Sequence, residues 1–193
     1  MELRKEISAY LSRKNNLTYN PKDEILVTVG GSEAIDLAIR ALVSNGDEVL
    51  IPEPSFVCYK PCTILAGGTP VVIVTKAENQ FRLTAQEIKE KITPKTKLLI
   101  LPYPSNPTGS VMRRSDLEAI AEVIKDTEIL VLTDEIYSEL TYEGSHVSFA
   151  SLPGMKERTI LVNGFSKSYA MTGWRLGYVA GPSTIIEAMT RIH

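Results

Sequence analysis

The chain has 193 residues, a formal net charge of −2 at pH 7 and 44% hydrophobic residues. Its basic residues are scattered and balanced by acidic ones, which argues against a nucleic-acid-binding protein. No apolar run is long enough to cross a bilayer, and the charged N-terminus does not resemble a signal peptide. We therefore expect a cytoplasmic protein that is not bound to a membrane, with enough residues for one well-buried domain.

Strand patterns and helix patterns alternate along the sequence. Most strand candidates are nearly continuous runs of valine, isoleucine and leucine, which is typical of strands covered on both faces. In chain order, the expected elements are helix 2–13, strand 25–29, helix 32–44, strand 48–51, helix 56–66, strand 71–74, helix 84–92, strand 97–101, helix 115–125, strand 129–133, strand 159–163, strand 176–180 and helix 184–192. This order predicts an α/β fold with three layers: a mostly parallel, seven-stranded sheet with helices on both faces.

Residues at the ends of three expected helices predict where those helices begin or stop. Asn45-Gly46 would cap the second expected helix at its C-terminus, and Gly67-Gly68 would end the third. Thr84 and Glu87 have the spacing of a capping box at the start of the fourth. The sequence has no internal repeat or interdomain linker, so we expect a single domain over residues 1–193.

The two cysteines, Cys58 and Cys62, stand four residues apart in the third expected helix, so their side chains could touch across one turn. Neither histidine is near them in the sequence, and a metal site needs more ligands. We interpret the cysteines as reduced packing thiols and predict no metal site.

Ligands of parallel α/β sheets bind beyond the carboxyl ends of the strands. Four groups of polar or glycine residues follow expected strands in this sequence, namely Gly30-Gly31, Pro102–Gly109, Asp134 with Tyr137, and Lys167. We therefore expect these groups to meet at one edge of the sheet and to form a ligand site there.

An anion site is predicted where a strand, a Gly-Gly turn and the start of a helix follow one another. The free N–H groups of Gly31, Ser32 and Glu33 would attract an anion to the start of that helix. Arg175 could bind a phosphate through two hydrogen bonds, and Ser166 could add a hydroxyl. Each feature also has a simpler explanation: an ordinary strand–turn–helix junction, a surface arginine and a solvent-facing serine.

Lys167 lies between small residues and eight positions before Arg175, a placement that suits a reactive amine beside an anion site. Such an amine can form a Schiff base with a carbonyl compound, although an isolated lysine is more often a surface charge. Asp134 ends an apolar strand, and is either a cap or the partner of a protonated ring nitrogen. Tyr137, three residues later, would serve the same ligand or pack as a half-buried residue.

Phe56 and Asn106 are weaker candidates when each is taken alone. Phe56 follows a strand and would stack on a planar ligand, although a place in the core also explains it. Asn106 precedes Pro107, which favours an extended backbone and leaves the amide free for hydrogen bonds. A simple turn also explains Asn106-Pro-Thr-Gly109, so both residues gain weight only beside the other segments.

Together these segments resemble the class I/II aminotransferases, which are fold-type-I pyridoxal-phosphate enzymes, and they look closest to the aspartate and aromatic aminotransferase branch. The resemblance covers nearly the whole chain, in the right order. It is carried mainly by Asn106-Pro-Thr-Gly109, Asp134-Glu-Ile-Tyr137 and Ser166-Lys-Ser-Tyr-Ala-Met-Thr-Gly-Trp-Arg-Leu-Gly177. It implies an enzyme of amino-acid metabolism that transfers an amino group from an amino acid to a 2-oxo acid by a ping-pong mechanism.

The resemblance also implies a role for each candidate residue. Lys167 would hold pyridoxal 5′-phosphate as a Schiff base and, once freed, would move a proton between the substrate Cα and the cofactor. Asp134 would keep the pyridine nitrogen protonated, and Phe56 would stack on the ring. Tyr137 and Asn106 would bond the phenolic oxygen. The phosphate would be held by Gly31, Ser32, Glu33, Ser166 and Arg175.

Members of this family are usually longer than this chain, and they are dimers with the site at the subunit interface. By that comparison we expect residues 1–193 to be the large, cofactor-binding domain, without the family's N-terminal segment and small C-terminal domain. Gly164 stands three positions before Lys167, where many relatives have a phosphate-binding serine. We expect a homodimer that binds the cofactor but is weak or inactive as a transaminase alone, because the small domain carries the arginine for the substrate carboxylate.

Other interpretations stay open at this point. Another fold-type-I enzyme, such as a β-lyase or an acyl-CoA-condensing synthase, would share the lysine, the aspartate and the phosphate-binding groups. A non-catalytic pyridoxal-phosphate-binding module would usually be fused to a DNA-binding segment, and no such segment is visible in this sequence. A nucleotide-binding doubly wound domain is disfavoured because its glycine fingerprints are absent.

Overall fold

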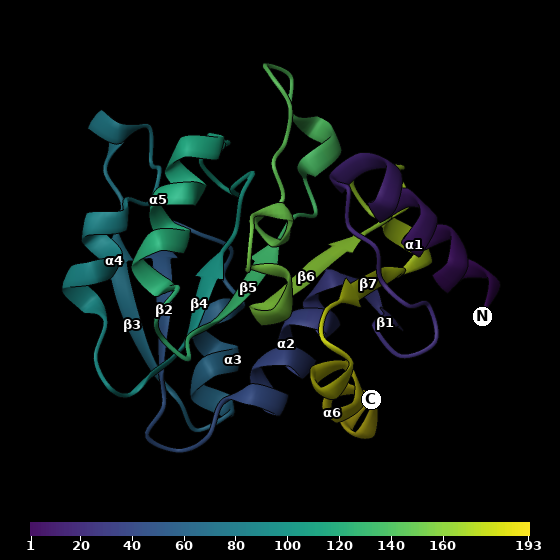
Figure 1. The fold of residues 1–193 in the computed structure, drawn as a ribbon, viewed down its shortest axis with the longest axis horizontal. Helices are drawn as coiled ribbons and strands as arrows, with labels where there is room; N and C mark the ends of the chain where they lie inside the picture. Colours follow the sequence, from purple (N-terminus) through teal and green to yellow (C-terminus); the bar gives the residue numbers. More distant parts are fainter.

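The computed structural model describes residues 1–193, and its central feature is a sheet of seven strands (Figure 1). The strands are β1 (Ile25–Thr28), β2 (Glu48–Glu53), β3 (Thr69–Val74), β4 (Thr96–Leu101), β5 (Leu130–Asp134), β6 (Thr159–Gly164) and β7 (Gly177–Ala180). They are ordered β1-β7-β6-β5-β4-β2-β3 across the sheet. The strand β7 runs antiparallel to both of its neighbours, β1 and β6, and all other pairings are parallel. The predicted mostly parallel sheet is thus confirmed.

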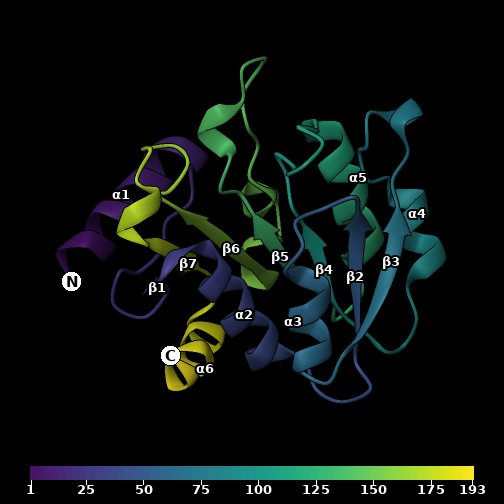
Figure 2. The ribbon, with the colours of Figure 1, turned by 180° about the vertical axis from the view of Figure 1, so that it is seen from behind.

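Helices cover both faces of this sheet. They are α1 (Glu2–Asn15), α2 (Gly30–Leu42), α3 (Tyr59–Leu65), α4 (Ala85–Lys91), α5 (Arg114–Ile124) and α6 (Ser183–Ile192). On one face lie α1, α4 and α5, while α2, α3 and α6 pack on the other, as the views from the two sides show (Figures 1 and 2). The molecule therefore has the three layers that the sequence pattern predicts.

The strands contain continuous apolar runs because helices cover both faces of the sheet. Successive residues of a strand point to opposite faces, so both faces must be apolar when both are buried. In β4, Leu98 packs in the core on the α2 side, whereas its neighbour Leu99 packs on the α5 side. In β6, Ile160 faces α2 and Leu161 faces α1. All four side chains are fully buried.

Helix ends agree with the sequence in two places and differ in a third. The capping box of Thr84 is present, and Gly67 adopts a left-handed φ of +85° just beyond α3. The expected cap at Asn45-Gly46 is wrong, because α2 ends at Leu42 and Val43 is already extended. Val43 is 5% exposed and lies where a side chain at Gly68 would be, so packing in the core ends the helix early.

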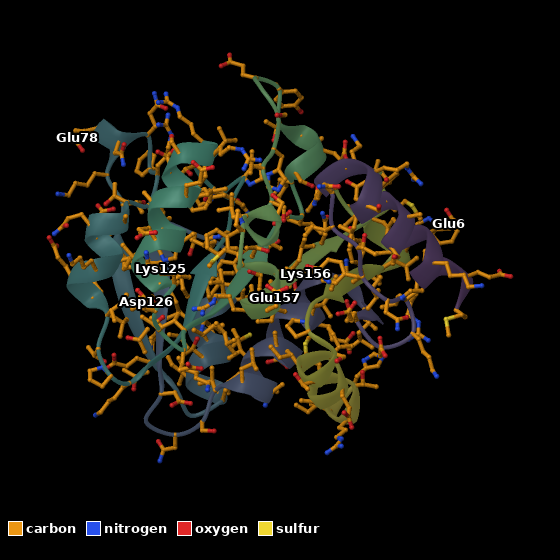
Figure 3. All side chains as sticks on the ribbon, viewed as in Figure 1. Glu6, Glu78, Lys125, Asp126, Lys156 and Glu157 are labelled. Atoms are coloured by element: carbon orange, nitrogen blue, oxygen red, sulfur yellow. The ribbon has the colours of Figure 1, made fainter.

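Charged side chains such as Glu6, Glu78 and Asp126 are exposed at the surface (Figure 3). None of the six helices combines the length and the apolar character that crossing a lipid bilayer requires.

Candidate functional site

A cavity of about 200 Å³ opens at the carboxyl edge of the sheet. Residues that follow β1, β4, β5 and β6, four strands that run in the same direction, contribute to its lining, as does the segment after β2. Nine of the ten residues predicted as site residues line it, namely Gly31, Ser32, Phe56, Asn106, Asp134, Tyr137, Ser166, Lys167 and Arg175. Segments that are far apart in the sequence thus meet where the sheet topology predicts.

The reversed strand β7 explains how Arg175 reaches the same edge as Lys167. Lys167 follows β6, whereas Arg175 precedes β7, which returns antiparallel alongside β6. The start of β7 therefore lies at the edge where the parallel strands end. The loop that joins the two strands brings both cationic side chains into one cavity.

Asp134, the last residue of β5, is 7% exposed and lines this cavity. Its Oδ2 accepts a 2.7 Å hydrogen bond from the hydroxyl of Tyr59, and its Oδ1 accepts one of 3.2 Å from the N–H of Ile136. Burial raises the pKa of Asp134 above its ordinary value, although both hydrogen bonds oppose this shift. A buried carboxylate with two fixed donors is suited to pair with a cationic ring nitrogen.

The Nζ atom of Lys167 makes no hydrogen bond and no ion pair with the protein. It lies 5.9 Å from the centroid of the Tyr137 ring, and both residues line the cavity that contains Asp134. The lysine is exposed as a residue and also lines the cavity. An unpaired amine in this position is free to react with a bound carbonyl compound.

The first turn of α2 forms a part of the cavity wall that is suited to bind an anion. The N–H groups of Gly31 and Ser32 have no acceptor within the helix, and the helix dipole favours negative charge at this end. The guanidinium of Arg175 lies directly above Gly30, where a Cβ would come within 2.6 Å of Nη2. Its Nη1 donates a 3.2 Å hydrogen bond to the carbonyl of Thr172, which orients the group.

Three glycines allow the start of α2 to lie this close to the sheet. Gly164 in β6 pairs with Gly177 in β7, and a Cβ at Gly177 would come within 2.4 Å of the carbonyl carbon of Gly30. A Cβ at Gly164 would come within 3.0 Å of Gly177 Cα and the Leu176 carbonyl oxygen. A serine at position 164 therefore has no room without a backbone shift, whereas Ser166 lines the cavity.

Glu33 is the one predicted residue that does not line the cavity. Its carboxylate turns back along the helix, where it accepts one hydrogen bond from the N–H of Val29 and pairs with the ring of His193 at 3.2 Å. The side chain thus binds the N-cap residue of α2 and the C-terminal histidine, and is no part of the cavity wall.

The remaining predicted residues line the wall and the mouth of the cavity. Phe56 lines the cavity and also packs edge-on against Tyr59, with ring centroids 6.0 Å apart. Asn106 is exposed on the loop after β4, and Ser166 is 8% exposed.

Sequence reasoning missed four lining residues, which are Ile35, Tyr59, Ile136 and Thr172, whereas Pro102 and Pro104 belong to the segment 102–109 that the sequence predicts at this edge. Tyr59 is the most important of them because it binds Asp134. Its spacing of three residues from Phe56 in an expected helix would have placed both rings on one helix face.

Cys58 and Cys62 are free, and Cys58 stands at the N-cap of α3. No group of three or more histidine, cysteine, aspartate or glutamate side chains is arranged to hold a metal ion.

Comparisons with known proteins point to one family. The sequence model for the aminotransferase class I and II family matches residues 1–193. The chain is 53% identical to the putative aminotransferase YugH of Bacillus subtilis (strain 168) over 99% of its own length and 50% of that protein. It is 51% identical to an aspartate aminotransferase of Pyrococcus abyssi, over 98% of this chain and 49% of that protein.

Among solved structures, the aromatic aminotransferase from Pyrococcus horikoshii OT3 matches with a TM-score of 0.97 and 48% identity, over 99% of this chain and 52% of that one. The chain thus spans about half the length of the curated relatives that it matches.

Proposed function

Because the chain belongs to the class I and II aminotransferase family, we propose that residues 1–193 form the cofactor-binding domain of a pyridoxal-phosphate-dependent aminotransferase. The reaction would transfer an amino group from an amino acid to a 2-oxo acid. Similarity to aspartate and aromatic aminotransferases supports an acidic or aromatic amino acid as the donor. One observation carries the proposal: a single cavity combines an unpaired lysine amine, a buried carboxylate and an anion-binding helix start.

The residues around the cavity fit pyridoxal 5′-phosphate at its charged positions. The first turn of α2 and the guanidinium of Arg175 supply donors for a phosphate, and the hydroxyl of Ser166 lines the same cavity. Asp134 supplies a carboxylate for the ring nitrogen. Because Gly30 has no side chain, the arginine can lie directly against the helix start.

The uncharged positions of the cofactor also have partners in the cavity wall. The ring of Phe56 offers an apolar face for stacking, while Asn106 and Tyr137 offer polar groups for a phenolic oxygen. Lys167 is the only lysine that lines the cavity, and its Nζ is the group available to bond with an aldehyde.

When bound, pyridoxal phosphate supplies an aldehyde carbon and an electron-withdrawing ring. Asp134 would accept a hydrogen bond from the protonated ring nitrogen and hold the proton there, since its own charge is buried and needs a cationic partner. The amine of Lys167, once free, would remove the proton from the substrate Cα and deliver it to the former aldehyde carbon of the cofactor. The walls that Phe56 and Ile35 contribute would exclude water from one side of the reacting groups.

Self-association and a reducing compartment belong to the same proposal. Trp174 is 70% exposed and Tyr169 is 53% exposed, on the loop that also carries Lys167 and Arg175. Large exposed aromatic side chains beside a site favour a protein partner, and we propose a homodimer. The two free cysteines favour the cytoplasm.

The experiment that tests this function is titration of the purified protein with pyridoxal phosphate. We expect a new absorbance band and covalent fixation of the cofactor after borohydride reduction. Amino-group transfer is then assayed with aspartate or an aromatic amino acid and 2-oxoglutarate, and we expect weak turnover from residues 1–193 alone. A protein that neither changes the spectrum nor retains the cofactor would contradict the proposal, and pyruvate with ammonia as products would indicate a lyase instead.

A further inference from the structure

The carboxylate of Glu135 is buried on the side of the sheet opposite to Asp134. Glu135 is 1% exposed and directly follows the last residue of β5. It lines a second cavity, of about 160 Å³, that lies between β5, α5 and the segment 141–149, whereas its neighbour Asp134 lines the first cavity. The two consecutive acids thus point to opposite faces of the sheet.

Two hydrogen bonds satisfy this buried carboxylate. Its Oε1 accepts a 2.7 Å hydrogen bond from the hydroxyl of Ser148, and its Oε2 lies 2.8 Å from Nε2 of His146. Ser148 is 2% exposed, and the side chain of His146 is 15% exposed. The side chain of Glu135 therefore ties the end of β5 to a segment that begins several residues later in the chain.

The backbone on both sides of Glu135 is fixed as well. Its N–H donates a 2.9 Å hydrogen bond to the carbonyl of Val162 in β6, and its carbonyl accepts one from the N–H of Ser138. The next N–H, that of Ile136, is one of the two donors that hold the carboxylate of Asp134. The Ile136 donor and Tyr137 therefore lie in the same turn as the backbone groups of Glu135.

We propose that Glu135 is a positioning residue for the cofactor cavity: through its bonds to His146 and Ser148 it fixes the turn that presents Asp134 and Tyr137. Only the expected effect on cofactor binding rests on the proposed function. The tether, by which we mean the side-chain bonds of Glu135 to His146 and Ser148, forms without a ligand. The side-chain hydrogen bonds of Glu135 go to His146 and Ser148, neither of which lines the first cavity.

The charge of Glu135 also affects the pKa of His146. Burial lowers the pKa of His146, but the charge and the hydrogen bond of Glu135 together outweigh it and raise that pKa. Other charged groups near His146 are Glu139 on the turn after β5, and Arg113 and Glu143 across the second cavity. The negative charge of Glu135 raises the pKa of Asp134. A protonated His146 partly compensates that charge and so reduces its effect on Asp134.

The test compares three substitutions in the full chain, with pyridoxal phosphate affinity as the first readout. Glu135→Ala removes the tether, and we expect affinity to fall about tenfold to a hundredfold, since hydrogen bonds to a buried charge are lost. Glu135→Gln keeps an oxygen that accepts from Ser148 and an N–H that can donate to a neutral His146. At mildly alkaline pH we therefore expect the affinity of this variant for pyridoxal phosphate to stay within about threefold of wild type. Glu143→Ala is the matched control, because that carboxylate lines the same cavity and makes no hydrogen bond or ion pair.

The second readout is amide hydrogen exchange in the cofactor-free protein, which is independent of the proposed function. Protection of the Ile136 amide should fall in Glu135→Ala while that of Leu161 in β6 stays at the wild-type level. If Glu135→Ala does not fold, Ser148→Ala removes a single hydrogen bond and should show the same local loss to a smaller degree.

Unchanged Ile136 protection in the folded variants would overturn the inference, as would equal losses in Glu135→Gln and Glu135→Ala. Failure of the wild-type protein to bind pyridoxal phosphate would instead count against the proposed function. The exchange data would then still decide whether the tether holds the turn.

Discussion

The hydroxyl of Tyr59 donates a 2.7 Å hydrogen bond to Oδ2 of Asp134, although the two residues lie 75 positions apart in the sequence. Tyr59 is 1% exposed, so this bond is protected from water. Burial removes the water molecules that would hydrogen-bond to the Asp134 carboxylate, and the hydroxyl of Tyr59 replaces one of those donors. The bond thus helps to keep a buried carboxylate available in its charged form, which the proposed pairing with a ring nitrogen requires.

The substitution Tyr59→Phe tests the value of this bond. The ring would still fill its place in the core, but Asp134 would lose one of its two donors, and its pKa would rise further. We expect pyridoxal phosphate to bind about tenfold more weakly, corresponding to a hydrogen bond to a charged group of ~1.5 kcal/mol. Spectroscopic titration measures the change. Tyr142→Phe is the control, since Tyr142 is 89% exposed, and an equal loss in both variants would contradict the assignment.

The raised pKa of Asp134 predicts how the stability of the cofactor-free protein depends on pH. Burial raises the folded-state pKa above that of the unfolded chain, so the folded state binds more protons between the two values. Stability should therefore fall as pH rises from the ordinary carboxyl range, about pH 4, through the folded pKa. Asp134→Asn should lack this loss and be the more stable protein at neutral pH.

The same substitution should weaken cofactor binding. A neutral amide cannot supply the counter-charge of a buried cation, and we expect a loss on the order of a hundredfold, or ~3 kcal/mol. Urea unfolding across the pH range gives the stability, and titration with pyridoxal phosphate gives the affinity. If Asp134→Asn is less stable than wild type without cofactor and binds pyridoxal phosphate with unchanged affinity, then Asp134 serves only the fold.

The sequence predicts the layers of this fold well, because strands that are buried on both faces contain continuous apolar runs. It does not show that β7 runs backwards, which is why Arg175 appears to follow no strand and yet lies beside Lys167. It also does not show which side-chain oxygen meets which donor. The contacts of Asp134 with Tyr59, and of Glu135 with His146, depend on how helices and loops pack after the sheet has formed.

The prediction for Asn45-Gly46 shows a related limit. A glycine after a helical pattern usually marks the C-cap, but here the core position of Val43 decides the end of α2 first. Tertiary packing prevails over local turn preference here, because the β-branched side chain of Val43 packs into the space that a side chain at Gly68 would take.

Gly30 and Gly31 are expected to respond differently to alanine. Gly30 has a φ of +80°, and its new Cβ would lie 2.6 Å from the Arg175 guanidinium, so the variant must both strain the backbone and displace the arginine. We expect Gly30→Ala to lose about 1–2 kcal/mol of unfolding free energy and most of its affinity for pyridoxal phosphate. Gly31→Ala places its Cβ 3.6 Å from the nearest atom, an ordinary contact, and should be as stable as wild type.

Denaturant unfolding and titration with pyridoxal phosphate separate these outcomes. Comparable stability and affinity in Gly30→Ala and wild type would mean that the helix start and Arg175 do not act together on the phosphate.

Lys167→Ala is the most direct test of the proposed chemistry. The side chain makes no hydrogen bond or ion pair and the residue is exposed, so its loss should change the unfolding free energy by no more than about 0.5 kcal/mol. Borohydride treatment should no longer fix pyridoxal phosphate to the protein, because no other lysine lines the cavity. Mass spectrometry of the reduced, digested protein locates any attachment.

Lys89→Ala serves as the control for that measurement, since Lys89 is an exposed lysine of α4 on the far side of the sheet. It should retain both the absorbance band and the fixed cofactor. Pyridoxal phosphate can react slowly with any accessible amine, so the deciding quantity is the site occupied at one equivalent of cofactor. Attachment spread over several surface lysines in the wild-type protein, with no preference for Lys167, would mean that the cavity does not select the cofactor and that the buried Asp134 has another purpose.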